Sequence, residues 1–263
     1  MCPDFELFGI PFYSYEIFLT IGMLLALVIG DRLGIKRQFS VKLQRFFIVV
    51  ILCSLMLGLM GAALFQAFYD FLKTGEFKAF GSGMTFYGGF IFGVITFLVL
   101  WFGIGKLLKL GKETKEKFKD VADIAGCVVP LGHGFGRLGC LFAGCCHGKI
   151  TDAWYGITVK FGGETLKVVP LQLFEAIFLF ALSAVMFWLF FKKNGEKRVP
   201  ILPIYAIAYG IWRFCLEFAR GDDRGATIVS FLTPSQLVAV LLIAIGGMYL
   251  GVYYHQKIKK VRK

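Results

Sequence analysis

The stretch FFIVVILCSLMLGLMGAALFQAF, residues 46–68, carries no charged residue and decides the class of fold. A helix of this length is long enough to cross the hydrocarbon core of a bilayer, which takes about 20 residues. The stretch is apolar on both faces, whereas a strand of a membrane β-barrel alternates apolar and polar residues. It therefore predicts a transmembrane helix, whose backbone hydrogen bonds are made within the segment.

Apolar runs of this kind recur along the chain, which is 57% apolar and only 17% charged. They predict an all-α, polytopic membrane protein with seven transmembrane helices in a single transmembrane domain, residues 1–263. The fourth run is short and interrupted by glycines, so we expect a half-buried or re-entrant segment there. The expected spans are approximately residues 14–30, 46–68, 86–104, 120–131, 170–191, 201–218 and 234–254.

The basic residues orient the chain. Lys and Arg outnumber Asp and Glu by 29 to 17, and they lie between the apolar runs rather than in a patch typical of nucleic-acid binding. Twenty of them fall in the connections 32–45, 106–119 and 192–198 and in the tail 257–263; eight fall on the opposite side. Because basic residues prefer the cytoplasm, this pattern predicts an outer N-terminus, a cytoplasmic C-terminus and an odd number of spans.

A glycine-rich stretch, LGHGFGRLGCLFAGCCHGK at residues 131–149, interrupts the apolar pattern near the outer face. Glycines at this density let a backbone approach a ligand closely and present amide donors to an anion. Arg137 adds a planar guanidinium suited to phosphate. The alternative is a tight re-entrant turn whose arginine meets lipid head groups, and the spacing does not separate the two.

A second polar site lies in the sixth span, YAIAYGIWRFCLEFARGDD, residues 205–223. Tyr209, Arg213 and Glu217 recur every four residues and therefore share one helical face, which Arg220 continues. A charge inside a membrane helix costs roughly 3 kcal/mol or more unless it is paired or hydrated, and Arg213 and Glu217 neutralise each other one turn apart. Such residues are functional candidates by default; an ion pair that only stabilises the bundle is the alternative.

Four more polar residues lie in or beside apolar runs at the same predicted depth. One of them is flanked by glycines in GSGMTFYGGF, residues 81–90, and another follows Thr233-Pro234-Ser235, a pattern typical of a helix start. Together with the arginines they predict a polar chamber open to the outer leaflet and an anionic phospholipid as its ligand. The four residues are Tyr87, Gln172, Glu175 and Gln236.

Three cysteines and a histidine cluster at Cys140, Cys145, Cys146 and His147. Their spacing matches no standard zinc-ligand pattern, and adjacent cysteines bind one ion only with strain. A disulfide from Cys140 to Cys145 or to Cys146 is chemically permitted on the outer face. Plain packing in a glycine-rich turn is the third interpretation, and all three stay open.

Five motifs, in order and on matching spans, resemble the prolipoprotein diacylglyceryl transferase family. Tyr15 is similar to the N-terminal tyrosine of that family, and GSGMTFYGGF is similar to its segment G-G-x-x-F-H-G-G. GRLGCLFAGCCHG, residues 136–148, resembles the signature G-R-I-G-N-F-x-N-G-E-x-x-G. VPLQLFEA, residues 169–176, resembles H-P-x-Q-L-Y-E-A, and YGIWRFCLEFAR, residues 209–220, resembles Y-x-x-x-R-x-x-x-E-F-x-R.

The resemblance implies transfer of a diacylglyceryl group from phosphatidylglycerol to the lipobox cysteine thiol of a prolipoprotein in the bacterial cytoplasmic membrane. It implies no metal, cofactor or nucleic acid, and we expect a monomer with its active site toward the outer face. Arg137 and Arg213 are suited to stabilise the phosphate leaving group. The candidate site residues are, for catalysis, Arg137, Arg213, His133, Tyr87 and Glu217, and, for lipid and substrate binding, Tyr15, Gly136, Gly139, Cys140, Tyr209, Arg220, Gln172, Glu175 and Gln236.

The chain departs from the family pattern where a base is needed. Tyr87 replaces the family histidine, and a phenol with an ordinary pKa of about 10 is a poorer base near neutral pH. Cys140, Ala143 and Cys145 replace two asparagines and a glutamate of the signature. His133 is the nearest candidate base, followed by His147. These departures leave a phospholipid-dependent transferase with another acceptor as an alternative; a membrane transporter and a thiol oxidoreductase are more distant ones.

Overall fold

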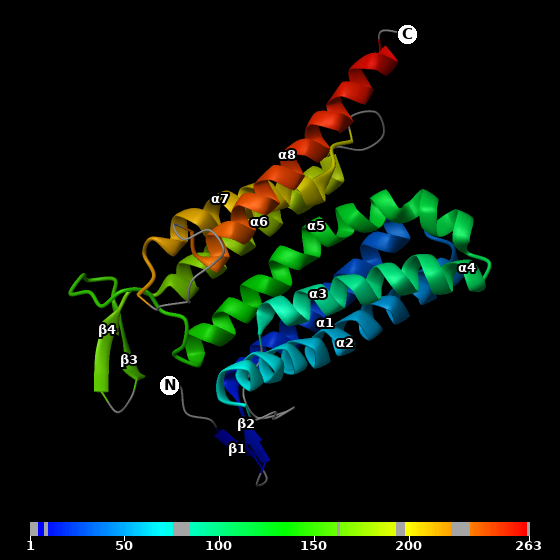
Figure 1. The fold of residues 1–263 in the computed structure, drawn as a ribbon. Helices are drawn as coiled ribbons and strands as arrows, with labels where there is room; N and C mark the ends of the chain where they lie inside the picture. Colours follow the sequence, from blue (N-terminus) through cyan, green and yellow to red (C-terminus); the bar gives the residue numbers. More distant parts are fainter. Residues whose placement is uncertain are drawn as a thin grey trace. The chain divides into compact units, whose positions relative to one another are not determined.

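The computed structural model describes residues 5–7, 10–75, 85–161, 164–192, 198–221 and 232–261. Within them the chain is mainly helical (Figure 1). Two short antiparallel hairpins interrupt the helices: β1 (Phe5–Leu7) with β2 (Ile10–Phe12), and β3 (Ile157–Phe161) with β4 (Glu164–Val168). The predicted all-α class is confirmed.

Seven long helices follow one another along the described chain. The third begins as α3 (Phe86–Leu98) and continues through a π-helical stretch, η1 (Val99–Ile104), into α4 (Gly105–Leu107). Six of the seven are long and apolar enough to cross a membrane; α7 has 17 residues, the lower end of the usual range. The other helices are α1 (Ser14–Lys36), α2 (Val41–Thr74), α5 (Gly111–Phe142), α6 (Leu171–Lys192), α7 (Ile201–Glu217) and α8 (Pro234–Val261).

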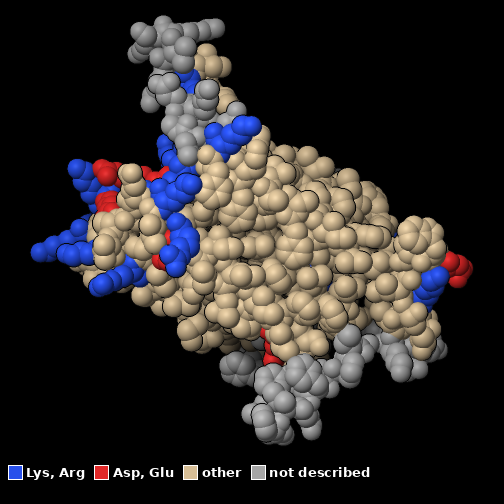
Figure 2. All heavy atoms as spheres, turned by 180° about the vertical axis from the view of Figure 1, so that it is seen from behind, with Lys and Arg blue, Asp and Glu red and all other residues tan. Residues whose placement is uncertain are grey.

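The outward faces of these helices are apolar. Leu24, Met56, Ile95 and Ile245 are each more than half exposed, and many other large apolar side chains are exposed with them. Figure 2 shows a face on which uncharged side chains cover most of the surface. Apolar area on this scale is unfavourable in water and suits contact with lipid. The helices therefore have the surface of a multi-pass membrane protein.

The expectation of a short or re-entrant fourth segment is wrong. The helix α5 runs without a break from Gly111 to Phe142, through Pro130 and through the glycines of the predicted turn. Because its amides from residue 132 to 139 lie within the helix, they are used by helical hydrogen bonds and do not form an anion-binding loop. Two of these glycines serve close packing: a Cβ at Gly134 would lie 2.7 Å from Cε1 of Phe180, and one at Gly139 would lie 3.0 Å from Cδ2 of Tyr15.

The chain divides into two compact units, one of residues Met1–Gly30 and Ala122–Lys263 and one of Asp31–Val121. In the second unit α2 packs on α3, and two predicted basic connections meet. Arg37 Nε lies 3.7 Å from Asp120 Oδ1, Lys117 Nζ donates to the Arg37 carbonyl, and Ser40 Oγ donates to Glu113 Oε2. The segments 32–45 and 106–119 therefore lie at the same end of this unit.

In the first unit, successive helices run in alternating directions. Ser183 Oγ on α6 donates to the Cys127 carbonyl on α5, and the amide of Ile201 at the start of α7 donates to Asp123 Oδ1. Tyr253 near the end of α8 donates to the carbonyl of Arg198. The end of α5, the start of α6, the end of α7 and the start of α8 consequently lie together.

Candidate functional site

Arg137 and Glu175 form a buried ion pair where α5 ends and α6 begins. Arg137 Nε lies 2.9 Å from Glu175 Oε2, and the Glu175 side chain is 1% exposed. The hydroxyl of Tyr209, on α7, donates to Glu175 Oε1 over 3.0 Å. One carboxylate thus joins three helices. Burial makes this arrangement costly unless both oxygens are engaged, and here both are.

A second buried pair lies on α7 and reaches the start of α8. Arg213 Nη2 lies 2.7 Å from Glu217 Oε2 and donates to Ser235 Oγ over 2.8 Å. The hydroxyl of Thr233 donates to Glu217 Oε1 over 2.9 Å. The pairing predicted from the four-residue spacing of Arg213 and Glu217 is confirmed, and Ser235 and Thr233 are additional partners.

The two pairs belong to one electrostatic cluster. Arg137, His133 and Arg213 all act on the charge of Glu175. The His133 ring packs edge-on against the Tyr209 ring, with centroids 5.1 Å apart. The structure therefore brings together the two arginines, His133, Tyr209 and Glu175, which the sequence placed on separate segments.

The cluster contains a buried hydrogen-bond donor without an acceptor among the described residues, and there is open space beside one of its helices. Arg213 Nη1 is buried and has no hydrogen-bond acceptor among the described residues. A buried guanidinium donor without a partner is costly, which makes it suited to an anionic ligand. Arg137 pairs with Glu175 through Nε. Beside it, a Cβ built on Gly136 meets no atom within 4 Å.

The N-terminal tyrosine lies against the end of α5. A Cβ at Gly139 would come 3.0 Å from Cδ2 and 3.1 Å from the carbonyl oxygen of Tyr15. Glycine at position 139 therefore allows α1 to approach α5 closely. This contact places Tyr15 against the last turn of α5.

Arg220 is buried, but it does not continue the helical face of α7 as expected. The helix ends at Glu217, and Arg220 forms an isolated antiparallel bridge with Gly148 in the segment after α5. On the same side, Gln172 Nε2 donates to the Cys145 carbonyl. Both residues hold the segment 143–149 against the ends of α6 and α7.

Gln236 has a local role that the sequence also indicates. Its side-chain oxygen accepts from the Thr233 amide, and the Thr233 hydroxyl accepts from the Gln236 amide. This reciprocal pair is a capping box, so the predicted helix start is confirmed. Tyr87, on α3, belongs to the other unit, where its ring contacts Phe86; Gly81 and Gly83 lie outside the described residues.

Three thiols converge just beyond the cluster. The sulfur atoms of Cys140, Cys145 and Cys146 all lie within 4.8 Å of one another, and the three residues are free cysteines. Hydrogen bonds from the other two thiols lower the pKa of the Cys146 thiol, and Arg137 and Arg220 lower it further.

The backbone that carries these thiols is strained. Gly144 has a φ of 69° and Cys146 a φ of 61°, in the left-handed region that non-glycine residues rarely adopt. For a cysteine this conformation costs on the order of 1–3 kcal/mol. The cost indicates that the surrounding contacts hold Cys146 in place.

The fold, its apolar surface and this cluster define a multi-pass membrane protein with buried ion pairs where its helices meet. Comparison with known proteins places it more narrowly. The family model described as prolipoprotein diacylglyceryl transferase matches residues 4–252. The chain therefore belongs to the prolipoprotein diacylglyceryl transferase family, as its motifs predict.

Curated relatives carry a matching name. A phosphatidylglycerol–prolipoprotein diacylglyceryl transferase of Clostridium tetani (strain Massachusetts / E88) is 31% identical over 252 residues, 92% of this chain and 93% of the relative. A second enzyme of that name from Clostridium perfringens (strain 13 / Type A) is 32% identical over 256 residues, with 93% and 92% coverage. One from Xanthomonas euvesicatoria pv. vesicatoria (strain 85-10) is 31% identical over 217 residues, with 74% and 70% coverage.

Proposed function

We propose that this chain transfers the diacylglyceryl group of phosphatidylglycerol to the lipobox cysteine thiol of a prolipoprotein. A thioether forms between the thiol sulfur and a glyceryl carbon, the carbon–oxygen bond to phosphate breaks, and glycerol phosphate leaves. The observation that carries the proposal for this site is the buried Arg213 Nη1, which has no acceptor among the described residues and lies in one cluster with Arg137.

The arginines act on the leaving group. As the carbon–oxygen bond breaks, negative charge develops on the phosphate oxygens, and fixed guanidinium donors in a dry site stabilise that charge. Glu175 and Glu217 orient the two arginines and compensate their charges in the absence of lipid. The open space beside Gly136 accommodates part of the lipid.

The acceptor thiol must lose a proton before it attacks. His133 is the candidate base within the cluster, where it packs on Tyr209. Tyr87 is the candidate that stands at the family histidine position. Tyr15, Gly139 and Cys140 border the acceptor side of the site.

We place the site toward the outer face of the bacterial cytoplasmic membrane, in a protein with seven spans, an outer N-terminus and a cytoplasmic C-terminus. The basic segments 32–45 and 106–119 lie at one end of their unit, as two connections on the same membrane side should. In the other unit, Arg198 contacts α8 near its end, away from the arginine cluster. We also propose that the protein acts as a monomer.

The test is incubation of the purified protein with phosphatidylglycerol and a lipobox peptide, followed by mass spectrometry. A diacylglyceryl-sized adduct on the peptide, with release of glycerol phosphate, is expected. A peptide with Ser in place of the lipobox Cys, and phosphatidylethanolamine in place of phosphatidylglycerol, should give no adduct. Release of glycerol phosphate without peptide modification would instead indicate a different acceptor.

A conservative variant tests the site itself. Arg213→Lys keeps the charge but loses the second donor nitrogen, so kcat should fall on the order of 10²–10³-fold. The matched control is Arg198→Lys, which alters the ion pair with Asp123, Nη2 to Oδ2 2.6 Å, at the other end of the unit. A rate for Arg213→Lys within about threefold of the wild type, at equal folded protein, would remove Arg213 from the mechanism.

A further inference from the structure

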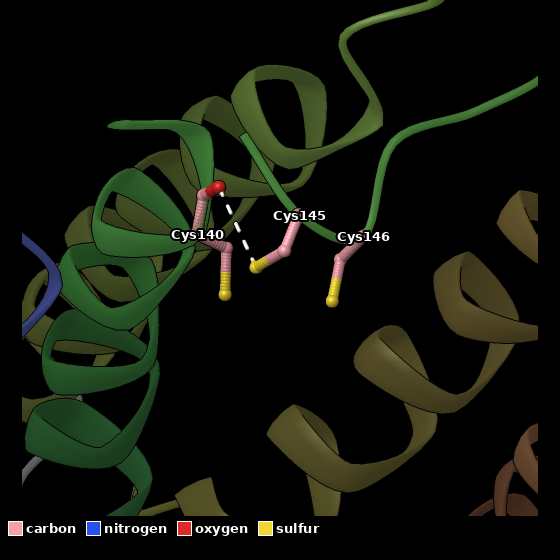
Figure 3. A group of neighbouring side chains, drawn as sticks. All are labelled: Cys140, Cys145 and Cys146. Atoms are coloured by element: carbon pink, nitrogen blue, oxygen red, sulfur yellow. Dashed lines mark hydrogen bonds between the residues drawn. The ribbon is translucent and has the colours of Figure 1, made fainter. Parts of the chain in front are cut away.

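Neither the fold nor the family motifs account for the close approach of the three thiols. Cys140 lies in the last turn of α5, and Cys145 and Cys146 lie in the segment that follows (Figure 3). In Figure 3 all three sulfur atoms point into the same space. The three sulfurs form the one candidate metal-ligand group found among the described residues.

The local backbone is arranged to bring adjacent cysteines to one point. Gly144 and Cys146, the residues on either side of Cys145, both have left-handed φ values. The amide of Cys145 donates to the Cys140 carbonyl over 3.2 Å, and Gln172 holds the Cys145 carbonyl from α6. Two adjacent cysteines can bind one ion only with a strained backbone. At Cys146 that strained conformation is already present in the folded chain.

The observed separations suit a shared metal ion. In a tetrahedral site with zinc–sulfur bonds of about 2.3 Å, two thiolates lie roughly 3.8 Å apart. Sulfurs already within 4.8 Å reach this geometry by small side-chain rotations. A disulfide joins only two thiols and leaves the third unused, and packing alone does not explain why Cys145 is exposed. Three sulfurs at one point favour a thiophilic ion.

We propose that Cys140, Cys145 and Cys146 bind one zinc-class divalent ion as three thiolates, and that the fourth coordination position receives the acceptor thiol. This inference rests on the proposed function, and it replaces the expectation that the chain needs no metal. Three protein ligands with one open position are typical of catalytic rather than structural zinc. The exposed side of the group, at Cys145, gives an incoming thiol access.

The location links the ion to the lipid site. Arg137 precedes Cys140 by three residues on α5 and so lies on a neighbouring part of the same face. Three thiolates and a divalent cation carry a net charge of −1, and this group lies beside the Arg137 guanidinium. A thiol on the ion therefore lies next to the leaving-group arginine.

The step balances without an oxidant or a reductant. Binding to the ion releases the acceptor thiol proton to solvent, and the bound thiolate attacks the glyceryl carbon. The sulfur–carbon bond forms as the carbon–oxygen bond breaks, and the electron pair leaves on the phosphate of glycerol phosphate. The thioether is a weaker ligand than a thiolate, so the product departs. This route supplies an activated thiol in a chain whose family histidine is Tyr87.

The experiment measures metal content and thiol coordination in the full-length protein in detergent. Protein prepared with Zn²⁺ should hold about one ion per chain. Cys145→Ser should lower zinc affinity on the order of 100-fold or more, since even partners beyond the ligands contribute 10–100-fold. Cys215→Ser, which changes an exposed cysteine of α7 outside the group, is the matched control and should keep full zinc content and activity.

The absorption spectrum of bound Co²⁺ tests which group occupies the fourth coordination position of the ion. Protein reconstituted with Co²⁺ alone should show sulfur-to-cobalt charge-transfer absorption, and a lipobox peptide should intensify it. A Ser-containing peptide should not. Unchanged cobalt spectra with the Cys peptide would overturn the assignment of the fourth ligand.

The remaining outcomes separate this inference from the proposed function. Transfer activity that persists in metal-free, chelator-treated protein would overturn the metal proposal and leave the transferase intact. A disulfide within the group, found by mass spectrometry in active protein, would overturn it as well. Zinc bound by the three cysteines in a protein that transfers no diacylglyceryl group would contradict the function but keep the ion site.

Discussion

The Arg137 guanidinium and the Glu175 carboxylate form an ion pair, Nε to Oε2 2.9 Å, whose second carboxylate oxygen accepts a hydrogen bond from Tyr209. The pair makes Glu175 the residue that positions Arg137, the arginine that we propose binds phosphate. The stability of the fold also depends on this pair, because removing one member of a buried ion pair leaves the other charge uncompensated.

Glu175→Gln tests this dependence. The variant keeps an oxygen for Tyr209 but leaves Arg137 without a counter-charge, so the free energy of unfolding should fall by about 3 kcal/mol. Transfer activity per folded molecule should fall at least about tenfold, because Arg137 is no longer oriented. Thermal unfolding in detergent and the peptide transfer assay measure the two effects.

The control for Glu175→Gln is Asp123→Asn at the opposite end of the same unit. Asp123 pairs with Arg198 and accepts from the Ile201 amide, so its loss should destabilise the fold to a similar degree. Activity per folded molecule should remain. Equal loss of activity in both variants would mean that Glu175 acts only through stability.

Tyr209→Phe tests whether the phenol positions Glu175 or reacts itself. The hydrogen bond to a charged acceptor contributes about 1.5–3 kcal/mol, and a positioning role predicts a loss of rate of about tenfold. A loss above roughly 10³-fold would instead indicate direct participation. Tyr205→Phe is the matched control, since Tyr205 stacks on Tyr209 with centroids 5.9 Å apart and the two rings remain stacked.

The helices were predictable because lipid-facing sequence is apolar on every side, but the continuity of α5 was not. Each glycine between residues 132 and 139 has a low helix propensity, so the sequence predicts a break in the helix there. The structure uses Gly22 and Gly139 for close approach of α1 and α5, a tertiary benefit that sequence spacing does not reveal. The seven-span count and the orientation stay predictions.

The site was predictable only where its partners share a helix. The Arg213–Glu217 pair follows from four-residue spacing. The Arg137–Glu175 pair joins α5 to α6, so each residue was recognised while the contact was missed. For the thiol group the sequence left a metal site, a disulfide and packing open, since nothing in it indicates the left-handed φ of Cys146.

Two glycines on α5 should respond oppositely to alanine. Gly139→Ala forces a Cβ to 3.0 Å from Tyr15 Cδ2 and should destabilise the protein by about 1–2 kcal/mol. Gly136→Ala places its Cβ in open space and should stabilise the helix by up to about 1 kcal/mol. Gly136→Phe should fold yet bind phosphatidylglycerol more weakly. Unfolding midpoints and KM measure these effects; similar midpoints for both alanine variants would contradict the packing.

The orientation predicts the activity of reporter fusions. Alkaline phosphatase fused after Asp152 should be active because that segment lies outside, and the same fusion after Lys112 should be inactive. A fluorescent protein at the C-terminus should fluoresce, since it folds in the cytoplasm. Active phosphatase at Lys112 would invert the topology and place the arginine cluster at the cytoplasmic face.

His133→Gln distinguishes proton transfer by a base from thiol activation by an ion. A lost general base lowers the rate by about 10²–10⁴-fold, and raising the pH restores part of it because more thiol ionises in solution. If the thiol loses its proton on the three-cysteine site, zinc-loaded His133→Gln should lose less than about tenfold, with an unshifted pH profile. Tyr87→Phe should behave likewise, since neither side chain then accepts the proton. A large loss in His133→Gln that high pH restores would return the role of base to His133.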